Sequence, residues 1–137
     1  MASTDTGEQV VAIRGYSHVN LQIRDLEREV TFYRDVLRFE VLARPDFDTK
    51  GAWLQHGTAQ IHLAVRDEIA ERVGFPHLAL LVPEDEFERT CAAIRARGVE
   101  WLRPPSTRED FGVTVRAVFV EDPEGNIIEL TTAGPQY

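Results

Sequence analysis

Cysteine is almost absent from this sequence of 137 residues: Cys91 is the only one. No disulfide can therefore form within the chain, and a zinc site built from several thiolates is excluded. Cys91 shares a helical spacing with Phe87 and Ile94, and a free cysteine on such a face is usually a small buried apolar residue. We expect it to belong to the core.

Positive charge is also scarce, since 15 basic residues stand against 23 acidic ones and give a formal net charge of -8. Nucleic-acid binding requires clustered cationic side chains against the phosphates, whereas the arginines here are scattered. No apolar run approaches the roughly 20 residues of a membrane-spanning helix, and residues 1–9 are polar and acidic, unlike a secretory signal. These features predict a cytoplasmic protein with neither a nucleic-acid nor a membrane partner.

Several catalytic motifs are missing as well. The sequence has no Gly-rich phosphate loop, no Ser/His/Asp signature and no helical His-Glu-x-x-His, so it offers no candidate for nucleophilic catalysis. With 43% hydrophobic residues, the chain is long enough to bury one core. We expect a single domain over residues 1–137.

An internal repeat organises the chain into two copies of strand, helix, strand, strand, strand, over approximately residues 14–66 and 76–132. Apolar and polar residues alternate in the strands, and the first helix has Asp25 as its N-cap and Leu26, Val30, Tyr33 and Leu37 on one face. Gly98 is expected to end the second helix, and residues 122–125 to form a turn. The expected strands are residues 16–23, 39–42, 52–55, 60–65, 76–82, 99–102, 113–121 and 126–131, and the expected helices run from Asp25 to about residue 38 and over 84–97.

Strand parity separates the residues that pack under the helices from those that face away, because a residue shares a face with its i+2 neighbours. In the first strand, Val19, Leu21 and Ile23 form the apolar set. The opposite faces of four strands carry His18, His62, His77 and Glu129. Two of these, His18 and His77, occupy the same step of each repeat, 59 residues apart.

Three imidazoles and one carboxylate form a ligand set for one divalent first-row metal ion, and Fe, Mn, Co, Ni and Zn all accept it. If the two sheets curve around a common hollow, His18, His62, His77 and Glu129 can converge on such an ion. The same parity nominates Asn20, Trp53, Gln60 and Phe119 as substrate-binding residues, although core packing would explain the two aromatic residues equally well. Solvated surface charge is the ordinary role for five further arginines, with binding of an anionic substrate as the alternative: Arg24, Arg44, Arg103, Arg108 and Arg116.

The arrangement resembles the vicinal oxygen chelate superfamily, which includes glyoxalase I, methylmalonyl-CoA epimerase, extradiol dioxygenases, fosfomycin-resistance thiol transferases and bleomycin-resistance proteins. The resemblance covers roughly residues 16–131 and is specific for the superfamily rather than for one reaction. It rests on Ser17-His-Val-Asn-Leu-Gln-Ile-Arg-Asp-Leu-Glu, Phe32-Tyr-Arg-Asp-Val-Leu-Arg-Phe39, Trp53-Leu-Gln-His-Gly, Gln60-Ile-His-Leu, Pro76-His-Leu-Ala-Leu and Phe119-Val-Glu-Asp-Pro-Glu-Gly-Asn-Ile-Ile-Glu-Leu130.

The resemblance implies an α+β fold of two βαβββ modules, with eight strands in a cupped mixed sheet backed by helices, usually in a homodimer. It places metal ligands at His18, His77 and Glu129, and in many members a fourth at His62. Glu129 is then also the candidate catalytic base. Arg38 stands where the family often has glycine at the end of the first helix.

The implied function is that of a metal-dependent enzyme acting on a small oxygen-rich or electrophilic metabolite, by isomerase, lyase or dioxygenase chemistry. Glyoxalase I usually has a carboxylate where this chain has His62, which argues against that particular isomerisation. The alternative is an antibiotic-resistance protein of the same fold, either a drug-sequestering binder or a thiol transferase. Retention of all four potential ligands weighs against pure sequestration. The sequence leaves open whether each site is completed within one chain or across a dimer.

Overall fold

The computed structural model describes residues 10–109 and 112–134 and contains the two expected βαβββ modules. The first module consists of β1 (Val19–Ile23), α1 (Leu26–Thr31), a π-helical turn η2 (Phe32–Val36), β2 (Glu40–Leu42), β3 (Gly51–His56) and β4 (Ala59–Val65). The second consists of β5 (His77–Leu81), a short 3-10 turn η3 (Glu84–Glu86), α2 (Phe87–Ala96), β6 (Arg103–Arg108), β7 (Val115–Glu121) and β8 (Ile127–Thr131). Residues 1–9, which are expected to lack a secretory signal, lie outside the described residues.

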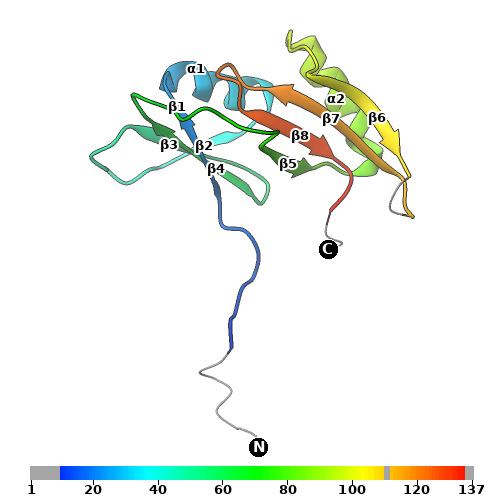
Figure 1. The fold of residues 1–137 in the computed structure, drawn as a ribbon, viewed down its shortest axis with the longest axis horizontal. Coiled ribbons are helices and arrows are strands. Elements are labelled where there is room, and N and C mark those ends of the chain that lie inside the picture. The colour runs from blue at the N-terminus through cyan, green and yellow to red at the C-terminus, as the bar shows by residue number, and fades with distance from the viewer. Residues whose placement is uncertain (1–9, 110–111, 135–137) are drawn as a thin grey trace, which may run out of the picture.

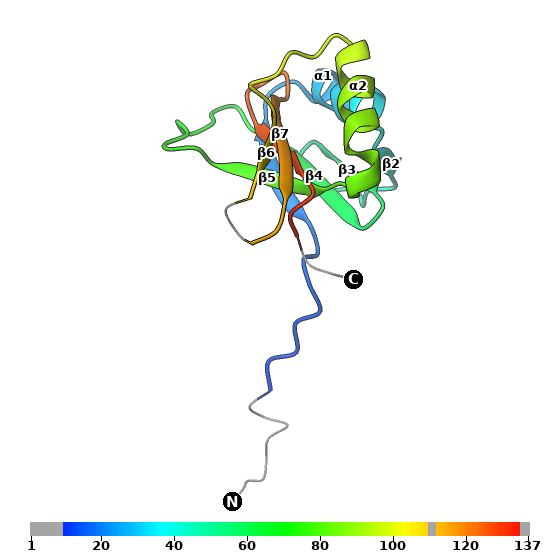
Figure 2. The same ribbon diagram turned by 90° about the vertical axis from the view of Figure 1, so that its right-hand side faces the viewer.

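The eight strands form two four-stranded mixed sheets with the same topology, in the orders β1-β4-β3-β2 and β5-β8-β7-β6. In each sheet the first and last strands of the module pair in parallel, and the remaining pairs are antiparallel. Figure 1 places the two sheets side by side, and Figure 2 shows α1 and α2 gathered on one side of the molecule. The opposite sheet faces are therefore free of helices.

One strand was predicted in the wrong place. The segment 99–102 was expected to be a strand, but β6 begins at Arg103 and contains Pro104 and Pro105. Proline cannot donate to a strand ladder and is tolerated mainly at sheet edges. Because β6 is the edge strand and its pairing with β7 shifts register between Arg103 and Ser106, both prolines are accommodated.

Each helical segment is followed, after its C-cap residue, by a residue in the left-handed backbone region. Arg97 is the C-cap of α2, and Gly98 follows with φ of 85°, as expected of a glycine terminator. In the first module Leu37 occupies the corresponding position, and Arg38 follows with φ of 62°. Arg38 is the one residue other than glycine that has a positive φ in the described part of the chain. A backbone position that glycine occupies easily in the second module is thus filled by arginine in the first.

A single cluster of buried apolar residues runs through both modules and contains Tyr33, Leu54 and Ile61 of the first and Phe87 and Ile128 of the second. Cys91 is buried in the same cluster, as predicted. The apolar strand faces are almost completely buried at Ile23, Ile61 and Leu63, whereas Val19, also expected on the apolar face, is 37% exposed. The helix-side faces of the sheets therefore form the core, which leaves the other faces for a site.

Polar contacts also join the modules. The side chain of Asp25 caps α1 by accepting from the Arg28 amide, as predicted, at 3.1 Å. Just before that helix, the backbone amides of Arg24 and Asp25 donate to the carboxylate of Glu124 in the β7–β8 turn, at 2.7–2.9 Å. That turn is formed as expected, with Gly125 at φ of 87° and its amide bonded to the Asp122 carbonyl. The second module therefore docks on the N-terminus of α1.

No helix in the described part of the chain combines the length and the apolar character that crossing a membrane would require.

Candidate functional site

The first histidine pair, His18 and His62, lies on the helix-free face of the first sheet. The parallel register of β1 and β4 pairs Val19 with Ile61, so the residues beside them are neighbours, and the imidazole rings of His18 and His62 stack with centroids 3.9 Å apart. Trp53 faces His62 directly across the β3–β4 pair and stacks on its other side at 4.3 Å. The expectation that His18, His62 and Trp53 share a face is met by direct contact.

Hydrogen bonds orient both imidazoles of this pair. One ring nitrogen of His62, Nε2, lies 2.7 Å from the Gln60 side-chain oxygen, and Nδ1 of His18 lies 3.0 Å from the Ser17 hydroxyl. Burial lowers the pKa of His62, and the nearby positive charges of His18 and Arg44 lower it further. A neutral imidazole, which is the form that binds metals, is thus favoured at His62.

The second pair, His77 and Glu129, lies on the corresponding face of the second sheet. Pairing of Ala79 with Glu129 in the parallel β5–β8 register brings the Glu129 carboxylate beside His77, with Nε2 and Oε1 3.1 Å apart. The other ring nitrogen, Nδ1, lies 2.8 Å from the carbonyl oxygen of Phe75. Because a carbonyl only accepts, Nδ1 must carry a proton, and this fixes the imidazole so that Nε2 points at the carboxylate.

This geometry fits a cation. With Nδ1 protonated, the neutral His77 ring presents a lone pair at Nε2, and two electron-rich atoms 3.1 Å apart would repel each other. Either a proton on Nε2 or a metal ion bound by both groups removes the repulsion. The side chains of His77 and Glu129 are 33% and 18% exposed, so the pair is open to solutes from one side.

Aromatic and cationic side chains surround the second pair. Phe119 faces Glu129 across the β7–β8 register, as expected, and contacts the His77 ring edge-on at 5.5 Å. The Phe75 ring contacts both of these rings, with its centroid 5.2 Å from that of His77 and 5.5 Å from that of Phe119. The guanidinium of Arg103 lies over the Phe75 ring at 4.0 Å. Sequence reasoning missed Phe75, because it lies in a connector without strand alternation.

A cavity of about 510 Å³ adjoins the first histidine pair. Asn20, Gln60 and Trp53, which were nominated as substrate-binding residues, line it. The remaining lining residues are Ser17, His18, Arg44, Phe47, Thr49, His62, Leu63, Ala64 and Arg66. Of these, Phe47, Thr49 and Arg66 were not anticipated, since the segments around β3 and beyond β4 show no periodicity that would aim a side chain.

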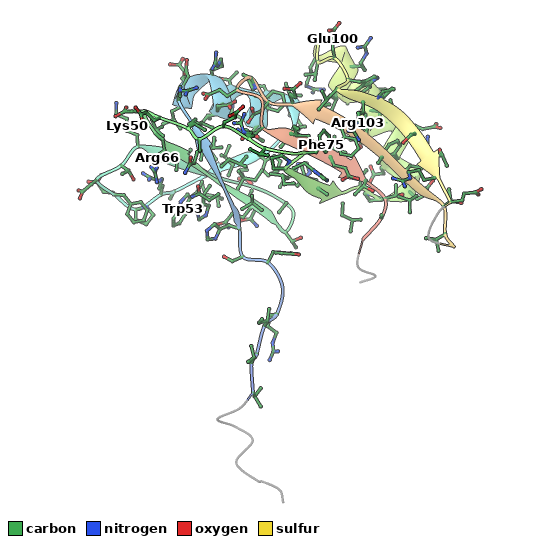
Figure 3. The ribbon with its side chains drawn as sticks, in the orientation of Figure 1. Lys50, Trp53, Arg66, Phe75, Glu100 and Arg103 are labelled. Atoms are coloured by element: carbon green, nitrogen blue, oxygen red, sulfur yellow. The ribbon has the colours of Figure 1, made fainter. Side chains whose placement is uncertain are left out.

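The structure brings the four expected metal ligands together as two pairs and not as one set of four. Among the described residues, no three side chains of His, Cys, Asp or Glu gather closely enough to hold a metal ion. In Figure 3, Trp53 and Arg66 lie at the first sheet, and Phe75 and Arg103 lie at the second. Within the described residues of one chain, the four expected ligands therefore do not converge on one point: His18, His62, His77 and Glu129.

Known proteins are similar to this chain in sequence and in architecture. The model of the Glyoxalase/Bleomycin resistance protein/Dioxygenase superfamily matches residues 15–130. The chain is 34% identical to the lactoylglutathione lyase of Haemophilus influenzae over 82% of its own length and 88% of that protein. It is 27% identical to the metallothiol transferase FosB of Staphylococcus saprophyticus, over 88% of this chain and 78% of that one. It spans only 35% of the chloroplastic probable lactoylglutathione lyase of Arabidopsis thaliana.

Among solved structures, a mutant of the fosfomycin resistance protein FosX from Listeria monocytogenes is similar with a TM-score of 0.73 and 22% identity. The match covers 90% of this chain and 95% of that one, whose crystals contain Mn(II) and 1S,2S-dihydroxypropylphosphonic acid. At this identity the likeness concerns the fold, and it agrees with the two βαβββ modules described above. The family model covers most of the chain, and the chain therefore belongs to the glyoxalase, bleomycin resistance protein and dioxygenase superfamily.

Proposed function

We propose that this chain is a metal-dependent enzyme that acts on a small oxygen-rich or electrophilic metabolite, and that two copies of the chain complete each active site. The observation that carries the proposal is the division of the ligands into the first histidine pair and the His77–Glu129 pair, on equivalent faces of the two sheets. Either pair offers only two donors, whereas three or four protein ligands are usual for a catalytic first-row metal.

A homodimer would supply the additional metal ligands that each pair lacks. In a twofold dimer every contact occurs twice, so the first histidine pair of one copy can meet the His77–Glu129 pair of the other at two equivalent places. Each of these places would combine His18 and His62 with His77 and Glu129 of the second copy. The free ring nitrogen of each stacked histidine and the open side of the second pair suit this arrangement.

The chemistry follows from the residues around the pairs. When bound, a divalent metal ion stabilises negative charge that develops on substrate oxygens. Trp53 and Phe119 provide apolar walls that exclude water, while Asn20 and Gln60 offer polar groups that orient a ligand. Glu129 would help to hold the metal ion, and its carboxylate oxygen Oε1 would accept a proton from the substrate. Lyase, isomerase and dioxygenase reactions all use a metal ion in this way. Similarity to a lactoylglutathione lyase favours a lyase, and His62, where glyoxalase I usually has a carboxylate, argues for a reaction other than that of glyoxalase I.

Metal content per chain, measured by elemental mass spectrometry on untagged protein, tests the metal site. Near-stoichiometric Fe, Mn, Co, Ni or Zn is expected, and its loss in a His77→Ala/Glu129→Ala variant. The exposed His56, whose ring contacts the Leu37 carbonyl away from both pairs, gives the matched control His56→Ala. Absence of metal after reconstitution would refute the enzyme proposal.

Mixing two defective variants tests the sharing of the site. A His18→Ala/His62→Ala variant and a His77→Ala/Glu129→Ala variant each lack one pair, so neither should hold metal alone. After the subunits exchange, half of the dimers are mixed, and each mixed dimer contains one intact site, which restores roughly a quarter of the sites. A site completed within one chain would restore none.

A second candidate is an antibiotic-resistance protein of the same fold. Similarity to the metallothiol transferase FosB and to the fosfomycin resistance protein FosX favours it. Loss of fosfomycin on incubation with the metal-loaded protein would support this candidate. Dependence of that loss on an added thiol identifies a transferase, whereas tight binding without loss identifies a sequestering protein.

A further inference from the structure

Arg44 follows β2 and lines the cavity beside the first histidine pair. Its Nε atom is buried and has no hydrogen-bond partner in the described part of the chain. Nor does any carboxylate among the described residues form an ion pair with it, although Asp46 and Asp48 lie on the same loop. A buried donor without a partner destabilises the fold, so such a group usually meets a ligand or water.

Packing holds the Arg44 guanidinium in place. It lies over the ring of Phe47, 4.8 Å from the centroid, which supports a cation without neutralising it. Gly51 of β3 provides the space for it, because a Cβ atom at that position would come within 3.1 Å of Nη2 of Arg44. The side chain is therefore a fixed donor rather than a freely moving surface charge.

The charge of the cavity is unusual for this protein. The whole chain has a net charge of -8, yet the described residues that line the cavity include two arginines, Arg44 and Arg66, and no carboxylate. The cavity is thus a local positive region next to His18 and His62. An anionic ligand would satisfy the unpartnered Nε and reduce the desolvation cost of the guanidinium.

We infer that Arg44, aided by Arg66, binds an oxyanion group of the substrate, namely a carboxylate, phosphate or phosphonate. This inference rests on the proposed function and narrows its substrate class: the molecule carries an anionic group beside the oxygens that approach the metal. The fork of Arg44 donors suits such a group, because guanidinium bonds oxyanions through two parallel N–H donors. Arg44 is in this view a specificity-determining residue, while His18 and His62 remain metal ligands.

Calorimetric titration with inorganic phosphate tests the inference on the protein as purified. Saturable binding is expected, and Arg44→Met should weaken it roughly tenfold or more, as expected for loss of a charge-assisted hydrogen bond. Arg44→Lys keeps the charge without the fork and should fall between the two. Arg89→Met is the matched control, because Arg89 lies exposed on α2 and pairs with Glu86. Equal phosphate affinity in all variants, or no saturable binding, would overturn the inference.

Metal content separates the two proposals. Arg44→Met should keep the metal content of the parent protein, since it removes an anion donor and not a metal ligand. A parallel loss of phosphate binding and of metal would mean that Arg44 supports the structure of the cavity, and would also overturn the inference. If metal is absent but phosphate binding depends on Arg44, the anion site stands and the enzyme proposal fails.

Discussion

The hydroxyl of Tyr33 donates a 2.7 Å hydrogen bond to Oδ2 of Asp122, which lies 89 residues further along the chain. Tyr33 is completely buried in the helical segment of the first module, and Asp122 begins the β7–β8 turn of the second. The same carboxylate accepts from the backbone amides of Glu124 and Asn126 and from the Asn126 side chain. This buried network joins the two modules and holds the turn before β8, the strand that carries Glu129.

Tyr33→Phe should destabilise the fold by about 1–3 kcal/mol, because the Asp122 carboxylate loses a donor while staying buried. The phenyl ring preserves the packing of residue 33 against Phe32 and Phe39, so the change in unfolding free energy measures the contribution of the hydroxyl group alone. Urea denaturation measures it. Tyr16→Phe is the control, since Tyr16 is 98% exposed, and equal stability of the two variants would contradict the assignment.

Glu29 should make stability depend on pH. The pKa of Glu29 is raised to about 9 from its ordinary value of 4.5, first by burial and then by the negative charges of Asp122 and Glu124, with Arg28 opposing the shift. The folded state therefore holds a proton that the unfolded chain releases above about pH 4.5. Its contribution is fully present below that pH and is lost as pH rises toward 9, by at most about 1.4 kcal/mol per pH unit.

Glu29→Gln removes this titration, so its unfolding free energy should fall less between about pH 5.5 and 8.5 than that of the parent protein. Urea denaturation across this range gives the comparison. Glu27→Gln, an exposed change on the same helix, is the control and should retain the parental slope. A parental slope in Glu29→Gln would show that Glu29 is ionised in the folded protein.

Arg38→Gly should stabilise the fold by about 0.5–1 kcal/mol, because a left-handed conformation costs an L residue more than it costs glycine. Gly98→Arg, at the corresponding position of the second module, should destabilise by about 1–2 kcal/mol. The Gly98 position is open enough for a side chain, since a Cβ there would meet nothing within 4 Å. Thermal unfolding of the two variants tests the pair, and a loss of stability in Arg38→Gly would assign the side chain a structural role.

Glu129→Gln should lower metal affinity roughly tenfold or more while leaving the fold intact, because the amide keeps the shape and loses the charge. Competition with a chelator measures the affinity. Where metal is restored by excess, turnover should remain reduced by at least about a hundredfold if Glu129 accepts the substrate proton. Unchanged turnover with metal bound would remove that role from Glu129. Glu121→Gln on β7 is an exposed control.

Much of the fold could be read from local patterns. Alternation in the strands, the apolar face around Tyr33, the Asp25 cap and the 122–125 turn depend on neighbours within a few residues, and all of them appear in the structure. The strand expected at 99–102 was misplaced because the apolar residues of that segment favour a strand, whereas the two prolines that follow argue against one. Those prolines are compatible with a strand only because β6 lies at a sheet edge, which depends on the whole sheet.

The candidate site divides in the same way. Parity placed His18, His62, His77, Glu129, Trp53 and Phe119 on helix-free faces, because side-chain direction in a strand follows from the backbone repeat. The grouping of the four expected ligands into two pairs follows from the parallel strand registers and from the hydrogen bonds of Tyr33, Asp122 and Glu124 that join the modules. These contacts connect residues that are far apart in the chain, so local patterns do not reveal them. In the sequence, Arg44 could not be distinguished from a solvated arginine, because the cavity beside its half-buried side chain exists only once the segment before β3 packs against the sheet.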